Sequence, residues 1–294
     1  MKEKILVHLN NIKNFFIIII FLFAVPFSAY SEEKKLDFLK TDWSFNGIFG
    51  TFDRASLQRG YQVYQEVCSG CHSVQHLSYR NLSEKGGPEF SVEEAKAIAS
   101  QFEVEDGPNS EGEMFIRPGR LSDKFVKPYP NVQATTAAND GAYPPDMSVL
   151  AKARAGGADY IYSLLLGYDE VPEGLQLDDG VYYNKYMPGN KIKMSEPISE
   201  GIVEYSDGTK STKEQIAKDV TTFLVWSSEP HLENQHRMGF KAIIYLIILI
   251  ILVYMSKQKV WSRFGSKMTK EEETFDKVER AVTEYEGEDP KTFK

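Results

Sequence analysis

The chain contains very little cysteine. Cys68 and Cys71 are its only two cysteines among 294 residues, so a framework of several disulfides is excluded. A disulfide between these two would close a very short loop and would add little loop-closure stability. It would also leave unexplained why His72 follows Cys71 directly. A structural zinc site normally takes four protein ligands, and no second cysteine pair exists to complete one.

Arginine is absent from the first thirty residues. A mitochondrial transit peptide is rich in arginine and amphipathic, so the sequence disfavours that class. Three lysines stand against one glutamate there, and an apolar run of 13 residues follows at 15–27. Small residues at Ala29 and Ser31 suit signal peptidase. We expect residues 1–31 to be a bacterial export signal. A retained membrane anchor is the alternative, but the run is short for one.

A second apolar run, "MGFKAIIYLIILIILVYM", covers residues 238–255 and contains one charge, Lys241. About 20 apolar residues span a bilayer, and a segment that is apolar on every face favours lipid over a core position. We expect a transmembrane helix at 238–256. Four basic residues follow, Lys257, Lys259, Arg263 and Lys267. Positive charge stays on the cytoplasmic side, which predicts a cytoplasmic charged tail at 257–294 and a periplasmic domain at 32–236.

The pattern C-x-x-C-H at Cys68, Cys71 and His72 is typical of covalent haem attachment. The two thiols lie one helical turn apart and can form thioethers with the vinyl groups, while the adjacent imidazole becomes the proximal iron ligand. No second C-x-x-C-H occurs. The sequence therefore predicts one haem c, bound covalently through two thioethers.

Two helices are predicted on either side of the domain. Leu57, Tyr61, Tyr64 and Val67 have near-helical spacing before the motif, with Asp53 or Ser56 as the cap and Gly60 allowing a close helix crossing. The second helix has a capping-box pattern at Ser211 and Glu214, followed by an apolar stripe that comprises Ile216, Val220, Phe223 and Leu224. The middle is rich in turn signals, and Asp207-Gly208 favours a small hairpin. We expect a mainly α c-type cytochrome domain with long loop insertions, plus one C-terminal transmembrane helix.

The sixth iron ligand is not decided by these patterns. A methionine would raise the reduction potential, as an electron carrier needs, and the candidates are Met114, Met147, Met187 and Met194. Most methionines fill gaps in cores. A second histidine would be His76, His231 or His236. His76 lies about one turn after His72, on the proximal side, and is therefore poorly placed to be the sixth ligand. His231 and His236 lie next to the membrane span.

The exported region resembles the cytochrome c1 family. The matching stretches include "WSFNGIFGTFDRASLQRGYQVYQEVCSGCHS", "EDGPNSEGEMFIRPGRLSDKF", "AANDGAYPPDMSVLAKARAGGADYIYSLLLGY", "YYNKYMPG" and "AKDVTTFLVWSSEP". Nearly everything from Trp43 to about Met255 is covered. The resemblance implies the haem subunit of a cytochrome bc1 complex.

The resemblance also implies roles for individual residues. It makes Met194, in "MSEP", the axial ligand beside His72, and it makes Met187 a packing residue. Haem-binding roles are implied for four further residues: Arg154 and Tyr160 near the propionates, and Asn139 and Pro145 in the haem wall. A guanidinium fork suits a propionate carboxylate. The chain departs from many relatives at Ala155, where they have histidine, and its two cysteines leave none for an extra disulfide.

Negative charge is concentrated in the expected periplasmic domain. The chain's net charge is −8; residues 32–236 carry −12, because the segments on either side each carry +2. Five acidic residues without a basic one occur at 103–113, and five more at 169–179. An acidic surface steers a basic redox partner at rates that depend on salt. We expect cytochrome c to be that partner, bound at one or both acidic loops.

The sequence thus predicts a membrane-anchored monohaem cytochrome in a bacterial inner membrane. It would pass single electrons from a Rieske iron–sulfur protein to a soluble or tethered cytochrome c, with cytochrome b as a further partner and no nucleic acid. We assign no catalytic residue and expect an electron-transfer subunit rather than an enzyme by itself. One alternative is a tethered carrier that feeds a terminal oxidase without a bc1 complex. The other is a non-redox tethering protein that uses Cys68, Cys71 and His72 for zinc.

Overall fold

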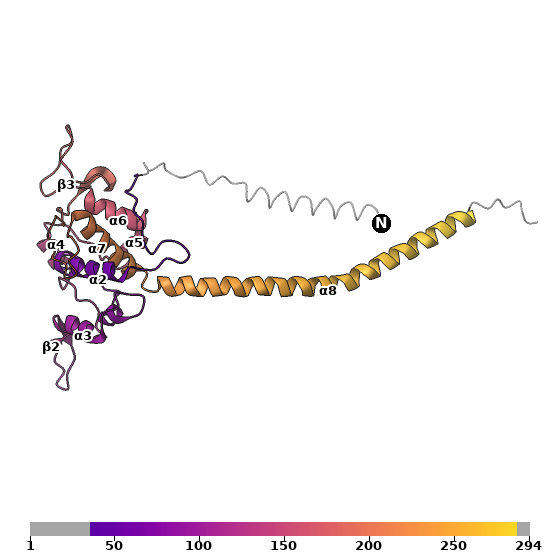
Figure 1. Cartoon of the computed structure of the whole chain (residues 1–294), viewed down its shortest axis with the longest axis horizontal. Coiled ribbons are helices and arrows are strands. Elements are labelled where there is room, and N and C mark those ends of the chain that lie inside the picture. Colours follow the sequence, from indigo (N-terminus) through magenta and orange to yellow (C-terminus); the bar gives the residue numbers. More distant parts are fainter. Residues whose placement is uncertain (1–35, 287–294) are drawn as a thin grey trace, which may run out of the picture. The chain divides into compact units, whose positions relative to one another are not determined.

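A computed structural model describes the backbone of residues 36–286 and the side chains of residues 36–262 and 273–281. The expected signal peptide at 1–31 and the last eight residues, 287–294, lie outside the described residues. The elements in chain order are α2 (Arg54–Val63), η1 (Tyr64–Cys68), η2 (Tyr79–Ser83), α3 (Val92–Ser100), β1 (Glu103–Asp106), β2 (Phe115–Pro118), α4 (Val132–Ala138), α5 (Leu150–Ala153), α6 (Gly157–Leu166), β3 (Tyr182–Tyr183), η3 (Pro188–Asn190), β4 (Lys191–Ile192), α7 (Lys213–Ser228) and α8 (Leu232–Glu286). The expected mainly helical fold is confirmed (Figure 1).

The strands of the described region form two small antiparallel sheets, β1 with β2 and β3 with β4. The hairpin that we expected around Asp207-Gly208 is wrong, because this segment makes a turn without strands. Gly208 N donates to Tyr205 O at 3.2 Å, and the Asp207 carboxylate accepts from Thr209 N at 2.9 Å. The turn is therefore closed by its own side chain and has no strand partner.

Helices α2 and α7 pack directly against each other, as the two apolar stripes predict. A Cβ on Gly60 would lie 2.1 Å from the carbonyl oxygen of Asp219, so only glycine allows this crossing distance. Asp53 caps α2 by accepting from Ala55 N and Ser56 N. The cap of α7 is Thr212, which accepts from Gln215 N. The capping box predicted at Ser211 is therefore wrong by one residue.

The core between these helices is rich in aromatic rings. Tyr64 from η1 stacks on Phe223 from α7 with centroids 5.5 Å apart, and Tyr79 stacks on Phe125 at 4.7 Å. Stacked and edge-to-face aromatic pairs add to the stability that their burial provides. The segment that leads into the C-x-x-C-H motif is thus fixed from one side by α7.

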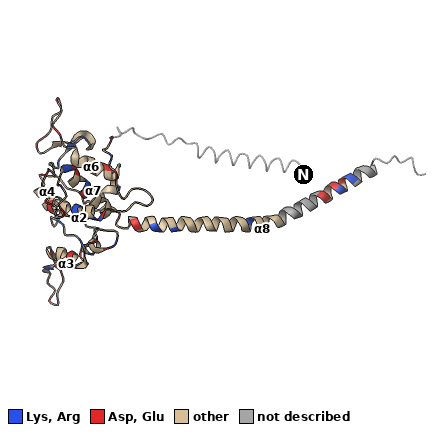
Figure 2. Cartoon of the chain, in the orientation of Figure 1, with Lys and Arg blue, Asp and Glu red and all other residues tan. Residues whose placement is uncertain are grey.

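Helix α8 is a single continuous helix in which Leu232–Ser262 is long and apolar enough to cross a membrane. Its most apolar 18-residue window has no buried share, and Figure 2 shows a long stretch of it without charged residues. The expected apolar C-terminal helix is confirmed. The first turn is held by Glu233, which accepts two hydrogen bonds of 2.8 Å from the Arg54 guanidinium. The expected tail remains helical as far as Glu286.

Candidate functional site

The two cysteines lie on a tight turn that follows directly from α2. The helix widens into the π-helical turn η1, where Ser69 N donates to Tyr64 O at 2.8 Å; such turns are frequent at functional sites. The backbone N–H groups of Cys71 and His72 then both donate to Cys68 O, at 3.1 and 2.9 Å. The turn therefore holds the two thiols and the imidazole on one short piece of backbone.

Neither cysteine is in a disulfide: Cys68 is half-buried and Cys71 is exposed. Burial, with a smaller contribution from Cys71, raises the pKa of the Cys68 thiol to about 12. Among the described side chains, no three or more His, Cys, Asp or Glu residues cluster as a metal site. The zinc alternative therefore gains no support, and both thiols are free to form thioethers.

The His72 ring has one nitrogen engaged. Its Nδ1 lies 2.8 Å from the carbonyl oxygen of Pro145, and since a carbonyl only accepts, Nδ1 must carry the proton. The Nε2 lone pair is then available to a metal, and a backbone carbonyl on the far nitrogen is the usual way in which a ligating histidine is oriented. Burial lowers the pKa of His72, against the opposing effects of Pro145 O and Asp146. A neutral imidazole with Nε2 free fits a proximal haem ligand.

The segment at 145–148 is fastened to the motif by Asp146, which our sequence reasoning missed. Its carboxylate accepts from Ser73 Oγ at 2.7 Å, Gln75 N at 3.0 Å and Ser148 N at 2.9 Å. Met147 N also donates to Ser73 O at 2.8 Å. The bond to Ser148 N is an Asx-turn, for which "PPDMS" is a local signal; nothing local indicates the bonds to the motif.

The four methionine candidates lie in different local settings. Met147 is buried in the core, and its backbone N donates to Ser73 O, directly after His72. Met114 is exposed and lies in the β1–β2 hairpin, directly before β2. Met187 Sδ accepts a weak hydrogen bond of 3.8 Å from Tyr160. Met194 is half-buried, and its carbonyl accepts from Tyr168 at 3.0 Å.

The other residues predicted near a haem lie in different local settings. Arg154 is exposed directly after α5; its guanidinium donates a long hydrogen bond of 3.4 Å to Ala153 O, and its carbonyl accepts from Gly157 N at 3.1 Å. Tyr160 is buried in α6, with its hydroxyl on Met187. Asn139 follows α4 and donates to Thr135 O at 2.7 Å. The structure thus brings Pro145 to His72 and Tyr160 to Met187, and it records no contact between Arg154 and Tyr160.

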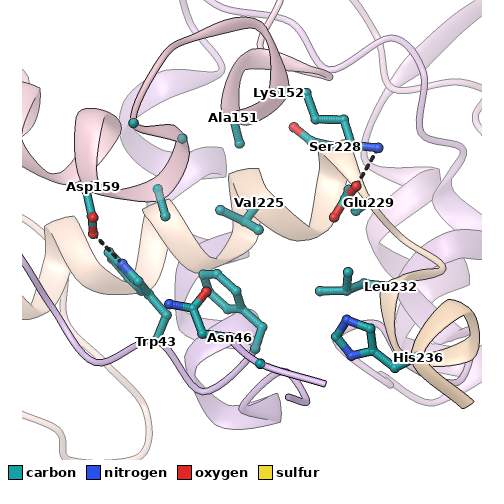
Figure 3. Close-up of a pocket in the computed structure, with 15 residues that line it drawn as sticks. Trp43, Asn46, Ala151, Lys152, Asp159, Val225, Ser228, Glu229, Leu232 and His236 are labelled. Carbon is teal, nitrogen blue, oxygen red and sulfur yellow. Dashed lines mark hydrogen bonds and ion pairs between the residues drawn. The ribbon is translucent and has the colours of Figure 1, made fainter. Parts of the chain in front are cut away.

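A cavity of about 410 Å³ is lined by residues of the 43–47 segment and of helices α5 to α8 (Figure 3). Its walls include Trp43, whose Nε1 donates to Asp159 at 2.7 Å, and the ion pair of Lys152 with Glu229 at 2.5 Å. None of the residues predicted to bind haem lines it.

In each of the two acidic loops, one of the acidic residues is paired with a basic residue. Asp106 is paired with Arg117, and Asp169 with Lys185. Four acidic residues of the hairpin are exposed, namely Glu103, Glu105, Glu111 and Glu113. The β1–β2 hairpin therefore presents a negative surface even after internal pairing.

A model of the Cytochrome C1 family matches residues 43–264. The chain is 45% identical to "Cytochrome c1-2, heme protein, mitochondrial" of Solanum tuberosum, over 83% of the chain and 93% of that relative. It is 48% identical to "Cytochrome b-c1 complex catalytic subunit, mitochondrial" of Candida albicans, over 75% of the chain and 76% of the relative. It is also 48% identical to "Cytochrome b/c1" of Bradyrhizobium diazoefficiens over 75% of the chain, but this covers only 35% of that relative.

Proposed function

Because the chain belongs to the cytochrome c1 family, we propose that it is the haem-bearing electron-transfer subunit of a cytochrome bc1 complex. The observation that carries this proposal is the state of His72, whose Nδ1 is held by Pro145 O at 2.8 Å beside two free thiols. That arrangement prepares one nitrogen and two sulfurs for a single haem. The names of the relatives supply the haem and the complex.

The chain's residues would hold the haem as follows. Cys68 and Cys71 would form the two thioethers, His72 would ligate through Nε2, and Met194 would supply the second iron ligand. Arg154 and Tyr160 would bind the propionates, and Asn139 and Pro145 would belong to the haem wall. When bound, the haem supplies a one-electron couple, and the protein sets its potential, orientation and access.

The route of the electron follows from family membership and charge. We propose the Rieske iron–sulfur protein as the donor and a cytochrome c as the acceptor, with cytochrome b as the neighbour in the membrane. The exposed carboxylates of the β1–β2 hairpin support a basic acceptor, because opposite charge accelerates the encounter of two redox proteins without requiring a tight complex.

The proposed location is a bacterial inner membrane, crossed once by α8. Residues 32–236 form the periplasmic haem domain, the span covers 238–256, and residues 257–294 form the cytoplasmic tail. The apolar length of α8 supports the span, and the four basic residues after it support this orientation. Residues 1–31 are proposed as the export signal.

The test is to purify the chain with an affinity tag from detergent-solubilised membranes and to record a reduced-minus-oxidised visible spectrum. The account predicts a c-type haem spectrum, together with cytochrome b, a Rieske subunit and quinol–cytochrome c reductase activity. A c-type spectrum without the other subunits would contradict membership of the complex and favour a tethered carrier. A chain without haem would contradict the electron-transfer function itself.

A further inference from the structure

Two adjacent large apolar side chains lie exposed beside the start of α8. Ile48 is 69% exposed and Phe49 is 74% exposed. Phe49 is the most exposed large apolar side chain of the described residues outside α8. Single exposed apolar residues are ordinary on protein surfaces, whereas neighbouring ones at a loop tip mark interaction sites. The segment 46–50, "NGIFG", is called the apolar loop below.

The apolar loop has a defined conformation. Asn46 N donates to Trp43 O at 3.1 Å, and Gly50 N donates to Gly47 O at 3.2 Å. Gly47 has φ +85°, a left-handed conformation that glycine adopts without strain. At Gly50 a Cβ would lie 2.2 Å from Phe45 O. The two glycines therefore close a tight turn, which holds Ile48 and Phe49 at its tip.

The same loop is fastened to the first turns of α8. His236 Nδ1 lies 3.0 Å from Gly50 O. Phe52 N donates to Glu233 at 2.9 Å, and the Arg54 guanidinium holds both oxygens of that carboxylate. The loop and the helix start are thus one rigid piece, so the position of the helix in a bilayer also sets the depth of the loop.

The tip of the apolar loop contacts the first residues of the apolar run in α8. The Phe49 ring contacts the Phe240 ring edge to face, with centroids 5.7 Å apart. Phe240 is the third residue of the apolar run at 238–255, between Arg237 and Lys241. Basic and aromatic residues at this position are typical of the membrane–water interface. With α8 as the proposed span, Phe49 would lie level with the boundary between headgroups and hydrocarbon.

The loop's other side faces the protein. Asn46 and Gly47 line the 410 Å³ cavity together with Leu232 and His236 of α8, whereas Ile48 and Phe49 do not line it (Figure 3). The two apolar side chains are therefore not covered by the cavity, in agreement with their exposed fractions of 69% and 74%.

We propose that Ile48 and Phe49 insert into the interfacial layer of the lipid bilayer as a second membrane contact beside α8. This inference rests on the proposed membrane span. Continuity of the apolar surface from Phe49 to Phe240 selects lipid as the occupant. A single helix leaves a domain free to tilt on the membrane, and a second contact near its base restricts that tilt, which orients the haem domain toward its partners.

The test places the photoreactive residue p-benzoylphenylalanine at position 49 of the full-length chain and irradiates membranes of expressing cells. The expected result is a chain whose mass increases by one phospholipid. Ile116 provides the matched control, because it is 61% exposed in β2 but should give no lipid adduct. Position 250, in the middle of the apolar run, should give one.

Each other outcome is informative. A phospholipid adduct at position 250 but none at 49 overturns the loop insertion and leaves the span intact. A covalent adduct of position 49 with another polypeptide overturns it in favour of a protein interface. The absence of a phospholipid adduct at position 250 overturns the span, and the loop insertion with it.

Discussion

At the residue scale, the imidazole of His72 is oriented by atoms more than seventy positions away. Pro145 O holds Nδ1, and Asp146 fastens that segment to Ser73 and Gln75. A ligand whose second nitrogen is engaged keeps its tautomer and ring orientation, and this raises its basicity toward a metal. The proximal side is thus organised by a segment that has no cysteine or histidine of its own.

Replacing the two loop methionines separately tests the distal ligand. Met194→Leu should lose the low-spin His/Met spectrum, bind carbon monoxide and lower the midpoint potential by more than about 0.1 V, because axial ligands tune haem potentials over about 0.8 V. Met187→Leu is the matched control, because the Met187 sulfur accepts a hydrogen bond from the Tyr160 hydroxyl. It should keep the low-spin spectrum and the midpoint potential of the wild type and should not bind carbon monoxide. The reverse pattern would assign the ligand to Met187.

The residue-scale predictions depended on signals of different kinds. The C-x-x-C-H pattern is local, so the attachment residues are evident from the sequence. Asp146 is not, because its bonds to Ser73 and Gln75 join segments that only the fold brings together. The assignments of Met194, Arg154 and Asn139 came from family resemblance and stay predictions.

At the element scale, the crossing of α2 and α7 has no space for a side chain at Gly60. In Gly60→Ala the new Cβ would meet Asp219 O and Phe223 Cβ, and overpacking of this kind costs about 1–3 kcal/mol. The thermal midpoint of the haem spectrum should therefore fall by several degrees. Gly239→Ala in α8, where a Cβ meets nothing within 4 Å, should leave it unchanged. Equal midpoints for the two variants would contradict the close crossing.

The stability of the β1–β2 hairpin should depend on pH, because Arg117 pairs with two carboxylates. This guanidinium binds Asp106 and Asp123, and its hydrogen bonds lower the pKa of both carboxyls. A depressed folded-state pKa stabilises the fold above the ordinary aspartate value near 4, and the contribution is lost as the pH falls through the lowered values.

Hydrogen exchange of residues 103–118 measures this contribution. Arg117→Gln should exchange faster than the wild type at about pH 6, and the difference should shrink at about pH 3, below the ordinary aspartate pKa. Comparison at each pH cancels the intrinsic pH dependence of exchange. A difference that is larger in acid would mean that the ion pairs do not hold the hairpin.

Helices α2 and α7 were predictable because their apolar periodicity is regular, although the cap of α7 is Thr212 rather than Ser211. The short strands were not. The segment around Asp207-Gly208 has hairpin residues, but Arg59 pairs with Asp207 at 2.7 Å, and this tertiary contact stabilises an isolated turn. The β1–β2 hairpin has one acidic strand, β1, and no apolar alternation, and the ion pair of Asp106 with Arg117 across the two strands stabilises it.

At the scale of the whole molecule, the −12 charge of residues 32–236 should control how fast a basic acceptor arrives. The double variant Glu103→Gln/Glu105→Gln should slow second-order oxidation by cytochrome c severalfold at low ionic strength, and the effect should disappear at high salt. The equal-charge control Glu93→Gln/Glu200→Gln should have a smaller effect. Equal rates for both pairs would locate the docking surface elsewhere.

The central claim is that this molecule carries one haem covalently through Cys68 and Cys71. The most direct measurement is the intact mass of the purified full-length chain after denaturation and acid–acetone extraction, with the double variant Cys68→Ala/Cys71→Ala alongside. The account predicts that the wild-type chain retains the mass of one haem and that the variant retains none. A wild-type chain without haem mass, or a variant that keeps it, would contradict the account.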